Sequence, residues 1–326
     1  MDRRRSLFAI PAVIYAIGIR QAAAQAAKVY RIGLLEIEPA RANRANMDAL
    51  LRGLKEAGYV EGKNLVIDYR AVEGRPERLP DLAAELIRAK PDIIVTRGSP
   101  ATLAVKAVGS VPIVMAATAD PVAAGIVKNL AHPGGNVTGL TNLVADLGPK
   151  RMEILRQIVP AGSRIGVLMN MGNPVNVRVW KGLETGAKAA GLVPILLDVR
   201  DANALDQALQ AAKAQGITAL EVDLEGVTMG RRGVITSFAA QHRLPAVYSA
   251  REAVDAGGLM SYGADYPHLY YRVASYIDKI LKGAKPGDLP IEQPTKLNLV
   301  INMKAARALG LTIPKELRLR ADEVIE

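Results

Sequence analysis

Two kinds of segment alternate along most of this chain. Short runs such as 29–35, 92–96 and 164–169 are rich in β-branched residues and almost wholly apolar, as in strands that a parallel sheet buries on both faces. Between these runs, apolar residues recur at every third or fourth position, which is typical of amphipathic helices. The alternation predicts an α/β protein with parallel sheets.

The predicted elements fall into two successive sets. Strands are expected at 29–35, 64–69, 92–96, 111–116 and 136–140, and then at 164–169, 192–197, 219–222, 246–248, 258–262 and 297–301. Ser99-Pro100 and Asp120-Pro121 each pair an N-cap residue with a proline, so they predict helix starts. We expect one of these helices over 120–130, with Val122, Ile126, Val127 and Leu130 buried, and single helices over 227–241 and 266–281. Each set predicts one doubly wound lobe.

The two sets end in similar sequences. Gly-Gly, an extended run and a polar pair close the first at 134–142 and the second at 257–265. This similarity predicts paired crossovers between the two lobes.

Composition narrows the chemistry. Half of the 326 residues are apolar and only 4% are aromatic, so aliphatic side chains must fill the cores. Cysteine is absent, which excludes disulfides, thiolate metal sites, cysteine nucleophiles and a lipid-modified amino-terminal cysteine.

The amino terminus has the pattern of a signal peptide. A charged segment, 1–5, precedes an apolar segment, 6–19, and small residues at 21–26 offer cleavage sites after Ala24 or Ala26. We therefore expect residues 1–26 to be removed and the protein to be periplasmic; an uncleaved anchor is the alternative.

The chain is basic, with a formal charge of +10. Residues 1–26 carry four arginines and one aspartate, so the remainder has a charge of +7. These charges are spread over predicted helix faces, so we expect no nucleic-acid partner, and a bias toward anionic ligands at most.

Familiar catalytic and cofactor motifs are missing. There is no Walker A sequence, no Gly-x-Gly-x-x-Gly turn after the first strand and no Gly-x-Ser-x-Gly. His132, His242 and His268 lie far apart, without paired metal-ligand spacing. The sequence thus predicts no cofactor, no metal site and no catalytic residue.

Polar residues gather instead where predicted strands end. In parallel sheets these ends share one edge, where ligands bind. The candidates for ligand binding are Glu36, Thr96, Arg97, Ser99, Thr118, Asp120, Asn142, Asn170, Asn173, Asp223, Glu225, Ser249, Tyr262 and Asp265. They include no nucleophile–base pair, which suits reversible binding of a small polar or zwitterionic molecule. The alternative for each is a local role, such as helix capping by Ser99 and Asp120.

Several stretches carry a family resemblance. They are LKEAGYVEGKNLVIDYR (54–70), PDIIVTRGSPATLAVKA (91–107), VPIVMAATADPVAAGIVKNLAHPGGNVTGLTN (111–142), AGGLMSYG (256–263) and ILKGAKPGDLPIEQPTKLNLVINMKAARALGLTIP (280–314). With them the chain resembles the substrate-binding proteins of ABC importers that have the type I periplasmic-binding-protein fold. Some members of that branch bind aromatic amino acids.

The resemblance implies a particular architecture. It implies two doubly wound parallel-sheet lobes joined by three crossovers, near Thr141, Gly263 and Pro290. Lobe 1 would comprise 27–141 plus 264–289, and lobe 2 would comprise 142–263 plus 290–326. A small-molecule ligand would be enclosed between the lobes by hinge closure and delivered to a membrane permease, and we expect a monomer.

The resemblance also selects among the candidate residues. Its ligand contacts correspond to Glu36, Ser99, Thr118, Asp120, Asn170, Asp223 and Asp265. The sequence departs from the family at 221–232 and at Arg97. We expect Arg97 to bind a ligand carboxylate, Asp223 or Asp265 to bind an ammonium group, and Tyr262 or Tyr266 to stack on a planar group. An exported sensor of the same fold and an exported α/β hydrolase are the alternative functions.

Overall fold

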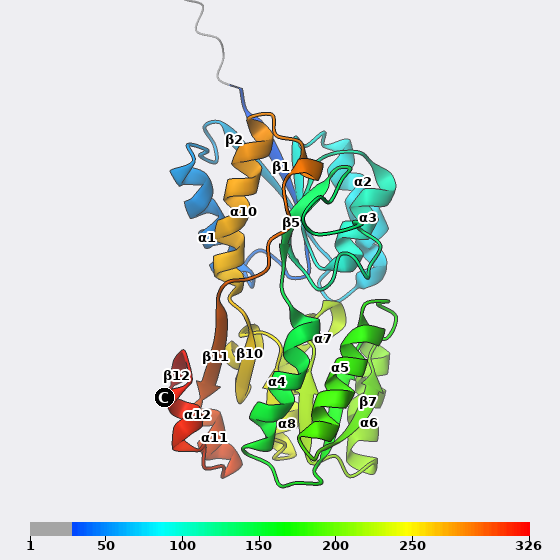
Figure 1. Cartoon of the computed structure of the whole chain (residues 1–326), viewed down its shortest axis with the longest axis vertical. Helices are drawn as coiled ribbons and strands as arrows, with labels where there is room; N and C mark the ends of the chain where they lie inside the picture. Colours follow the sequence, from blue (N-terminus) through cyan, green and yellow to red (C-terminus); the bar gives the residue numbers. More distant parts are fainter. Residues whose placement is uncertain (1–27) are drawn as a thin grey trace, which may run out of the picture.

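The computed structural model describes residues 28–326 and shows two α/β lobes arranged end to end (Figure 1). The predicted signal peptide lies outside the described residues. We define lobe 1 by its five-stranded sheet and lobe 2 by its seven-stranded sheet. Two mainly parallel sheets with helices on their faces confirm the α/β class.

Lobe 1 is a doubly wound unit with strand order β2-β1-β3-β4-β5, all parallel. Its strands are β1 (Tyr30–Glu36), β2 (Leu65–Ala71), β3 (Ile93–Arg97), β4 (Ile113–Thr118) and β5 (Val137–Thr141). Helices α1 (Arg44–Glu56) and α10 (Tyr266–Leu281) pack on one face, and α2 (Leu79–Arg88) and α3 (Ser99–Val108) on the other. Short 3₁₀ turns, η1 (Pro76–Arg78) and η2 (Pro286–Asp288), complete the lobe.

Lobe 2 has strand order β12-β11-β10-β9-β8-β6-β7. The strands are β6 (Arg164–Met169), β7 (Val193–Asp198), β8 (Ala219–Val222), β9 (Ala246–Tyr248), β10 (Met260–Ala264), β11 (Leu297–Asn302) and β12 (Glu323–Ile325). The helices are α4 (Val144–Arg156), α5 (Asn176–Ala189), α6 (Ala202–Ala214), α7 (Gly226–Gly230), α8 (Arg232–Gln241), α9 (Glu252–Asp255), α11 (Met303–Leu309) and α12 (Lys315–Leu319). Helices α4 and α5 cover one face, and α6 to α8 the other.

The chain crosses between the lobes three times, after β5, after β10 and after η2 (Figure 1). The second crossing sends α10 back to lobe 1, where it packs against α1. The three predicted crossovers are confirmed, while the exact lobe limits at residues 141, 263 and 289 stay predictions.

Two predictions about lobe 2 were incomplete. The sheet is not wholly parallel, because β11 returns from the third crossover and pairs with β10 in the antiparallel sense. The predicted helix over 227–241 is two helices, because the chain departs from helical geometry at Arg231, where φ is −107°.

The predicted helix over 120–130 was wrong. Asp120 accepts hydrogen bonds from the backbone N–H groups of Val122 and Ala123, as a cap should, but only one turn follows. Gly125 then adopts a left-handed conformation (φ 68°), which ends the turn. Ile126 and Val127 are nevertheless buried in lobe 1, whereas Val122 is exposed.

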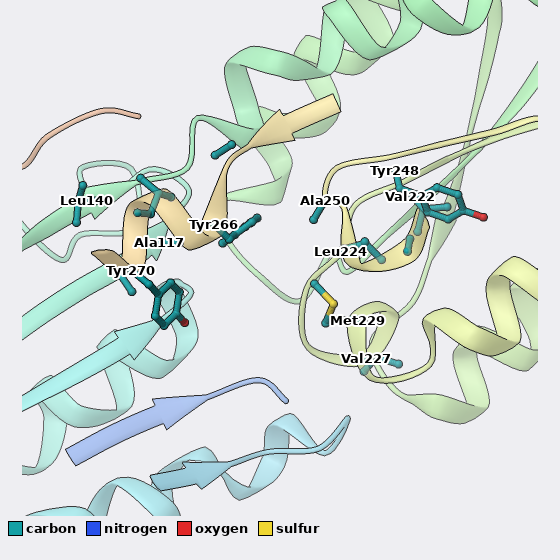
Figure 2. Packing of buried hydrophobic residues seen from close by; sticks show 14 of the residues in the cluster. Ala117, Leu140, Val222, Leu224, Val227, Met229, Tyr248, Ala250, Tyr266 and Tyr270 are labelled. Atoms are coloured by element: carbon teal, nitrogen blue, oxygen red, sulfur yellow. The ribbon is translucent and has the colours of Figure 1, made fainter. Parts of the chain in front are cut away.

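An apolar cluster continues from one lobe into the other (Figure 2). Ala117 and Tyr266 belong to its lobe 1 side, and Leu224 and Ala250 to its lobe 2 side. These contacts bury apolar surface between the lobes. The hydrophobic effect therefore stabilises the closed arrangement in addition to the polar contacts.

One glycine of β5 fits only without a side chain. Gly139 has φ 128°, and a Cβ atom there would lie 2.2 Å from the Met115 carbonyl oxygen on β4. We expect Gly139→Ala to lower the free energy of unfolding by about 4 kcal/mol, as measured by urea denaturation. Gly135→Ala is the control, because Gly135 also has positive φ (63°) but no atom within 4 Å of its Cβ position. It should cost about 1–2 kcal/mol, and equal losses in the two variants would contradict the argument.

Candidate functional site

The carboxyl ends of the parallel strands in both lobes face each other across a small cavity of about 40 Å³. Its lining comes from loops after β1, β3, β4 and β5 in lobe 1, from loops after β6 and β8 in lobe 2, and from the start of α10. The lining residues are Ile37, Arg97, Gly98, Ser99, Ala117, Ala119, Asn142, Val144, Asn173, Asn176, Asp223, Leu224, Glu225 and Tyr266. We call this the cleft. It brings together six predicted site residues: Arg97, Ser99, Asn142, Asn173, Asp223 and Glu225.

The lobe 1 wall of the cleft is centred on the amino end of α3. Gly98 precedes the helix with φ 88°, and Pro100 occupies its first turn. The first backbone N–H groups of a helix have no helical acceptor and carry a partial positive charge. The Ser99 hydroxyl is also buried without a hydrogen-bond partner. This wall therefore offers hydrogen-bond donors to an anionic group.

Arg97 ends β3, contributes to the lining of the cleft and is almost fully buried. Its Nη2 atom is 2.8 Å from Oε1 of Glu252, on α9 of lobe 2. Its guanidinium also lies 4.4 Å from the ring centroid of Tyr266. Arg97 thus joins the lobes in this structure, and its predicted use as a carboxylate anchor stays a prediction.

Two buried glutamates accompany Arg97 in lobe 1. Glu36 accepts a hydrogen bond from the Tyr270 hydroxyl at 2.6 Å, and burial raises the pKa of Glu36 to about 7 against the opposing charge of Arg97. Glu38 forms an ion pair with Arg232 of lobe 2. Burial also raises the pKa of Glu38, although Arg97 and Arg232 oppose this. The predicted site residue Glu36 lies near Arg97 but is not one of the residues that line the cleft.

The lobe 2 wall of the cleft is acidic. Asn173 and Asn176, at the start of α5, each donate an amide hydrogen bond to one carboxylate oxygen of Glu225. Burial and the neighbouring charge of Asp223 raise the pKa of Glu225 to about 8. Burial raises the pKa of Asp223 too, while Arg151 opposes the shift. Neither carboxylate forms an ion pair within the described residues.

Further contacts hold the lobes together around the cleft. Asp120 of lobe 1 pairs with Arg178 of lobe 2. Gly74 and Gly230 also approach closely, since a Cβ atom on Gly230 would lie 2.9 Å from the Gly74 Cα atom. The lobes are therefore closed on each other. Sites for small molecules usually enclose roughly 300 Å³ or more, so a ligand larger than a few atoms requires the lobes to separate.

The remaining predicted site residues have local contacts. Thr96 hydrogen-bonds to Thr102, Asn170 caps the turn at Gly172, and Ser249 accepts from the Leu224 N–H. The Thr118 hydroxyl is buried without a partner near the end of β4. Tyr262 packs against the core of lobe 2 beneath α4 and α5. These five side chains are not among those that line the cleft.

Asp265 belongs to a second and larger cavity of about 690 Å³, between the start of α1 and β10 to β12. Asp265 caps α10 through the His268 N–H and pairs with Lys296 at 2.7 Å. Arg251 in the same cavity pairs with Glu323. Since these charges are mutually neutralised, and strand ends of both sheets meet elsewhere, we take the smaller cleft as the candidate site.

Several residues of the site were not predicted. Asn176 lies three positions after Asn173, so the two could have been recognised as neighbours on one helical turn. Arg232 lies in the segment that departs from the family pattern. No sequence pattern identified Glu38 or Glu252, because their partners, Arg232 and Arg97, lie far away in the sequence.

The chain is similar to known proteins over nearly all of the described residues. The family model for ABC transporter substrate binding proteins matches residues 32–325, nearly the whole described chain. The chain belongs to this family. It is a solute-binding protein and not an enzyme, which confirms the sequence prediction and removes the hydrolase alternative.

One curated relative and two solved structures are similar to this ABC transporter substrate binding protein. A tyrosine-binding protein of Clostridioides difficile is 27% identical over 263 residues, covering 80% of this chain and 75% of the relative. The structure of a conserved domain protein from Vibrio cholerae has a TM-score of 0.83 at 30% identity, covering 91% of this chain and all of that one. A Streptococcus pneumoniae ABC domain in complex with L-Trp also has a TM-score of 0.83, at 26% identity and with the same coverage.

Residues 28–326 contain neither a cluster of metal ligands nor a membrane-spanning helix. No group of three or more histidine, aspartate or glutamate side chains there has the arrangement of a metal site. No helix in this part of the chain is long and apolar enough to cross a membrane.

Mutation of Glu252 can test whether its ion pair with Arg97 stabilises the closed arrangement of the lobes. Glu252→Gln removes the one ionic partner that lobe 2 gives the buried Arg97 in the described residues and leaves only Glu38 of lobe 1, 3.9 Å away. We therefore expect the closed-to-open ratio without ligand to fall at least about tenfold. Single-molecule FRET can measure it, with dyes on Lys63→Cys and Lys213→Cys, since both positions are exposed and the chain has no other cysteine. Glu153→Gln removes an exposed pair within α4 and is the control. An unchanged ratio in Glu252→Gln would count against the pair as a tie between the lobes.

Proposed function

We propose that this protein is the periplasmic receptor of an ABC importer that captures an amino acid, with an aromatic amino acid as the first candidate, and presents it to a membrane permease. The observation that carries the proposal is the opposite character of the two walls of the cleft. Lobe 1 contributes the positive amino end of α3 and the Ser99 hydroxyl. Lobe 2 contributes Asp223 and Glu225.

A zwitterion matches these walls. Its carboxylate would accept hydrogen bonds from the first turn of α3 and from Ser99, as anions do at helix amino termini. Its ammonium group would lie against Asp223 and Glu225, neither of which forms an ion pair in residues 28–326. One such molecule bridges both lobes and therefore binds better to a state in which the lobes enclose it, somewhat further apart than in this structure, than to a fully open state.

The relatives support an aromatic side chain. One is described as a tyrosine-binding protein, and another was solved with L-Trp. In this chain Tyr266 lines the cleft and lies against Arg97. The small volume of the closed cleft implies that ligand binding and lobe movement are linked, as hinge closure requires.

The ligand chemistry can be tested by calorimetry. We expect L-tyrosine or L-tryptophan to bind, and their analogues without the carboxylate (tyramine, tryptamine) or without the amine (3-indolepropionic acid) to bind at least about 30-fold more weakly. The reason is that a lost hydrogen bond to a charged group costs roughly 2 kcal/mol or more. Equal affinity for an amino acid and its amine-free analogue would refute the zwitterion model.

The acidic wall can be tested by mutation. Asp223→Asn should weaken amino-acid binding about tenfold or more, because the ammonium group loses a charged partner. Asp206→Asn is the control, since Asp206 lies on the exposed face of α6 and its single ion pair among residues 28–326 is with Arg231. Isothermal titration of both variants gives the comparison, and loss of affinity in the control alone would argue against this cleft.

A further inference from the structure

A fully buried ion pair lies beneath the lobe 2 wall. Arg151 on α4 donates from Nε to Oε1 of Glu221 on β8 at 2.6 Å, and both side chains are 0% exposed. Neither residue lines the cleft. Burying such a pair costs several kcal/mol of desolvation, which its own attraction often fails to repay. Stability alone is therefore a weak explanation for it.

Strand geometry places this pair directly under Asp223. Residues two apart on a strand lie on the same face of the sheet. Ala219 of β8 packs in the cluster beneath α4 and α5, whereas Leu220 and Val222 pack on the opposite face. Asp223 continues the strand pairing, since its N–H donates to the Leu168 carbonyl. Glu221 and Asp223 therefore both face α4, where Arg151 lies.

Glu221 accepts a hydrogen bond from only one of the three guanidinium nitrogens of Arg151. Its Nη1 and Nη2 atoms are buried without hydrogen-bond partners. The other groups near Asp223 are Glu221 and Glu225 on its own segment, Ser249 after β9, and Tyr266 of α10. Arg97 lines the opposite side of the cleft but is paired with Glu252. Arg151 is thus the cation that acts on Asp223 from within lobe 2.

We propose that Arg151 is a positioning residue, which favours the charged form of Asp223 from beneath the cleft and so prepares the lobe 2 wall for a protonated amine. The proposal rests on the function proposed above. Glu221 has the opposite effect on Asp223 and favours its protonated form. The Glu221 carboxylate shields Asp223 from part of the positive charge of Arg151.

The sign of the pH dependence follows from these charges. Burial raises the pKa of Asp223 and raises that of Glu225 to about 8, so the empty cleft takes up protons as the pH falls. An arriving ammonium group favours the charged carboxylates and displaces those protons. Affinity for an amine-bearing ligand should therefore increase with pH up to about 8.

Two substitutions should move this dependence in opposite directions. Arg151→Met removes the cation, so Asp223 should lose its proton about one pH unit higher than in the wild type. Glu221→Gln leaves the cation unshielded, so Asp223 should lose its proton at lower pH. Arg151→Lys keeps the charge and should stay close to the wild type. A packing defect without electrostatic origin would not produce opposite shifts.

Two measurements on the whole protein test this. Carboxyl ¹³C NMR without ligand gives the titration midpoint of Asp223, assigned by the signal missing in Asp223→Asn. Calorimetry with L-tyrosine gives the dissociation constant between about pH 5.5 and 8.5. We expect about tenfold weaker binding by Arg151→Met at the acidic end, and little difference at the basic end.

The outcomes are distinct. Unmoved midpoints, or midpoints that move in the same direction in Arg151→Met and Glu221→Gln, overturn the inference. If Arg151→Met does not fold, Glu221→Gln alone decides by the direction of its shift. If the midpoints move as expected but L-tyrosine and the other amino acids do not bind, the proposed function fails while the electrostatic role of Arg151 stands.

Discussion

Arg97 is buried where the two lobes meet, and a charge in that position needs partners from both. Removing one partner of a buried ion pair costs roughly 3–5 kcal/mol. Glu252 of lobe 2, Glu38 of lobe 1 (3.9 Å) and the ring of Tyr266 at the second crossover provide the compensation. The pairing of Glu38 with Arg232 repeats the arrangement nearby. The relative position of the lobes, and with it the shape of the cleft, depends on satisfying these charges.

The ion pair between Arg97 and Glu252 limits the groups that lobe 1 can present to a ligand. A free arginine would make lobe 1 a strong anion site by itself. With Arg97 committed to Glu252, the donors left to a ligand are the first turn of α3 and Ser99, which are weaker and more directional. Selectivity then depends more on the acidic wall of lobe 2, where Asp223 and Glu225 form no ion pair in the described residues.

Much of the fold could be predicted because its signals are local. The buried strand at 92–96 and the helix at 266–281 were found almost to the residue, since their apolar patterns are continuous. The direction of β11 was not predictable, because an apolar run does not record whether the strand pairs parallel or antiparallel. The helix expected at 120–130 failed at Gly125, whose left-handed conformation outweighed a good cap.

The site was predictable only in part, for a related reason. Strand ends identified Ser99, Asn173, Asp223 and Glu225, since topology alone gathers such positions at one edge. The partner of Arg97 could not be found this way. Glu252 is 155 residues further along the chain, in a helix of four residues that is too short to show a periodic pattern.

The return of α10 to lobe 1 has a consequence for folding during synthesis. Lobe 1 lacks one of its covering helices until residues 266–281 exist, because hydrogen bonds such as Tyr59–Asp278 and Glu36–Tyr270 join positions 219 and 234 residues apart. Contacts at such separation form slowly, since a long loop must close first. The amino-terminal half of a growing chain therefore cannot reach its final structure early.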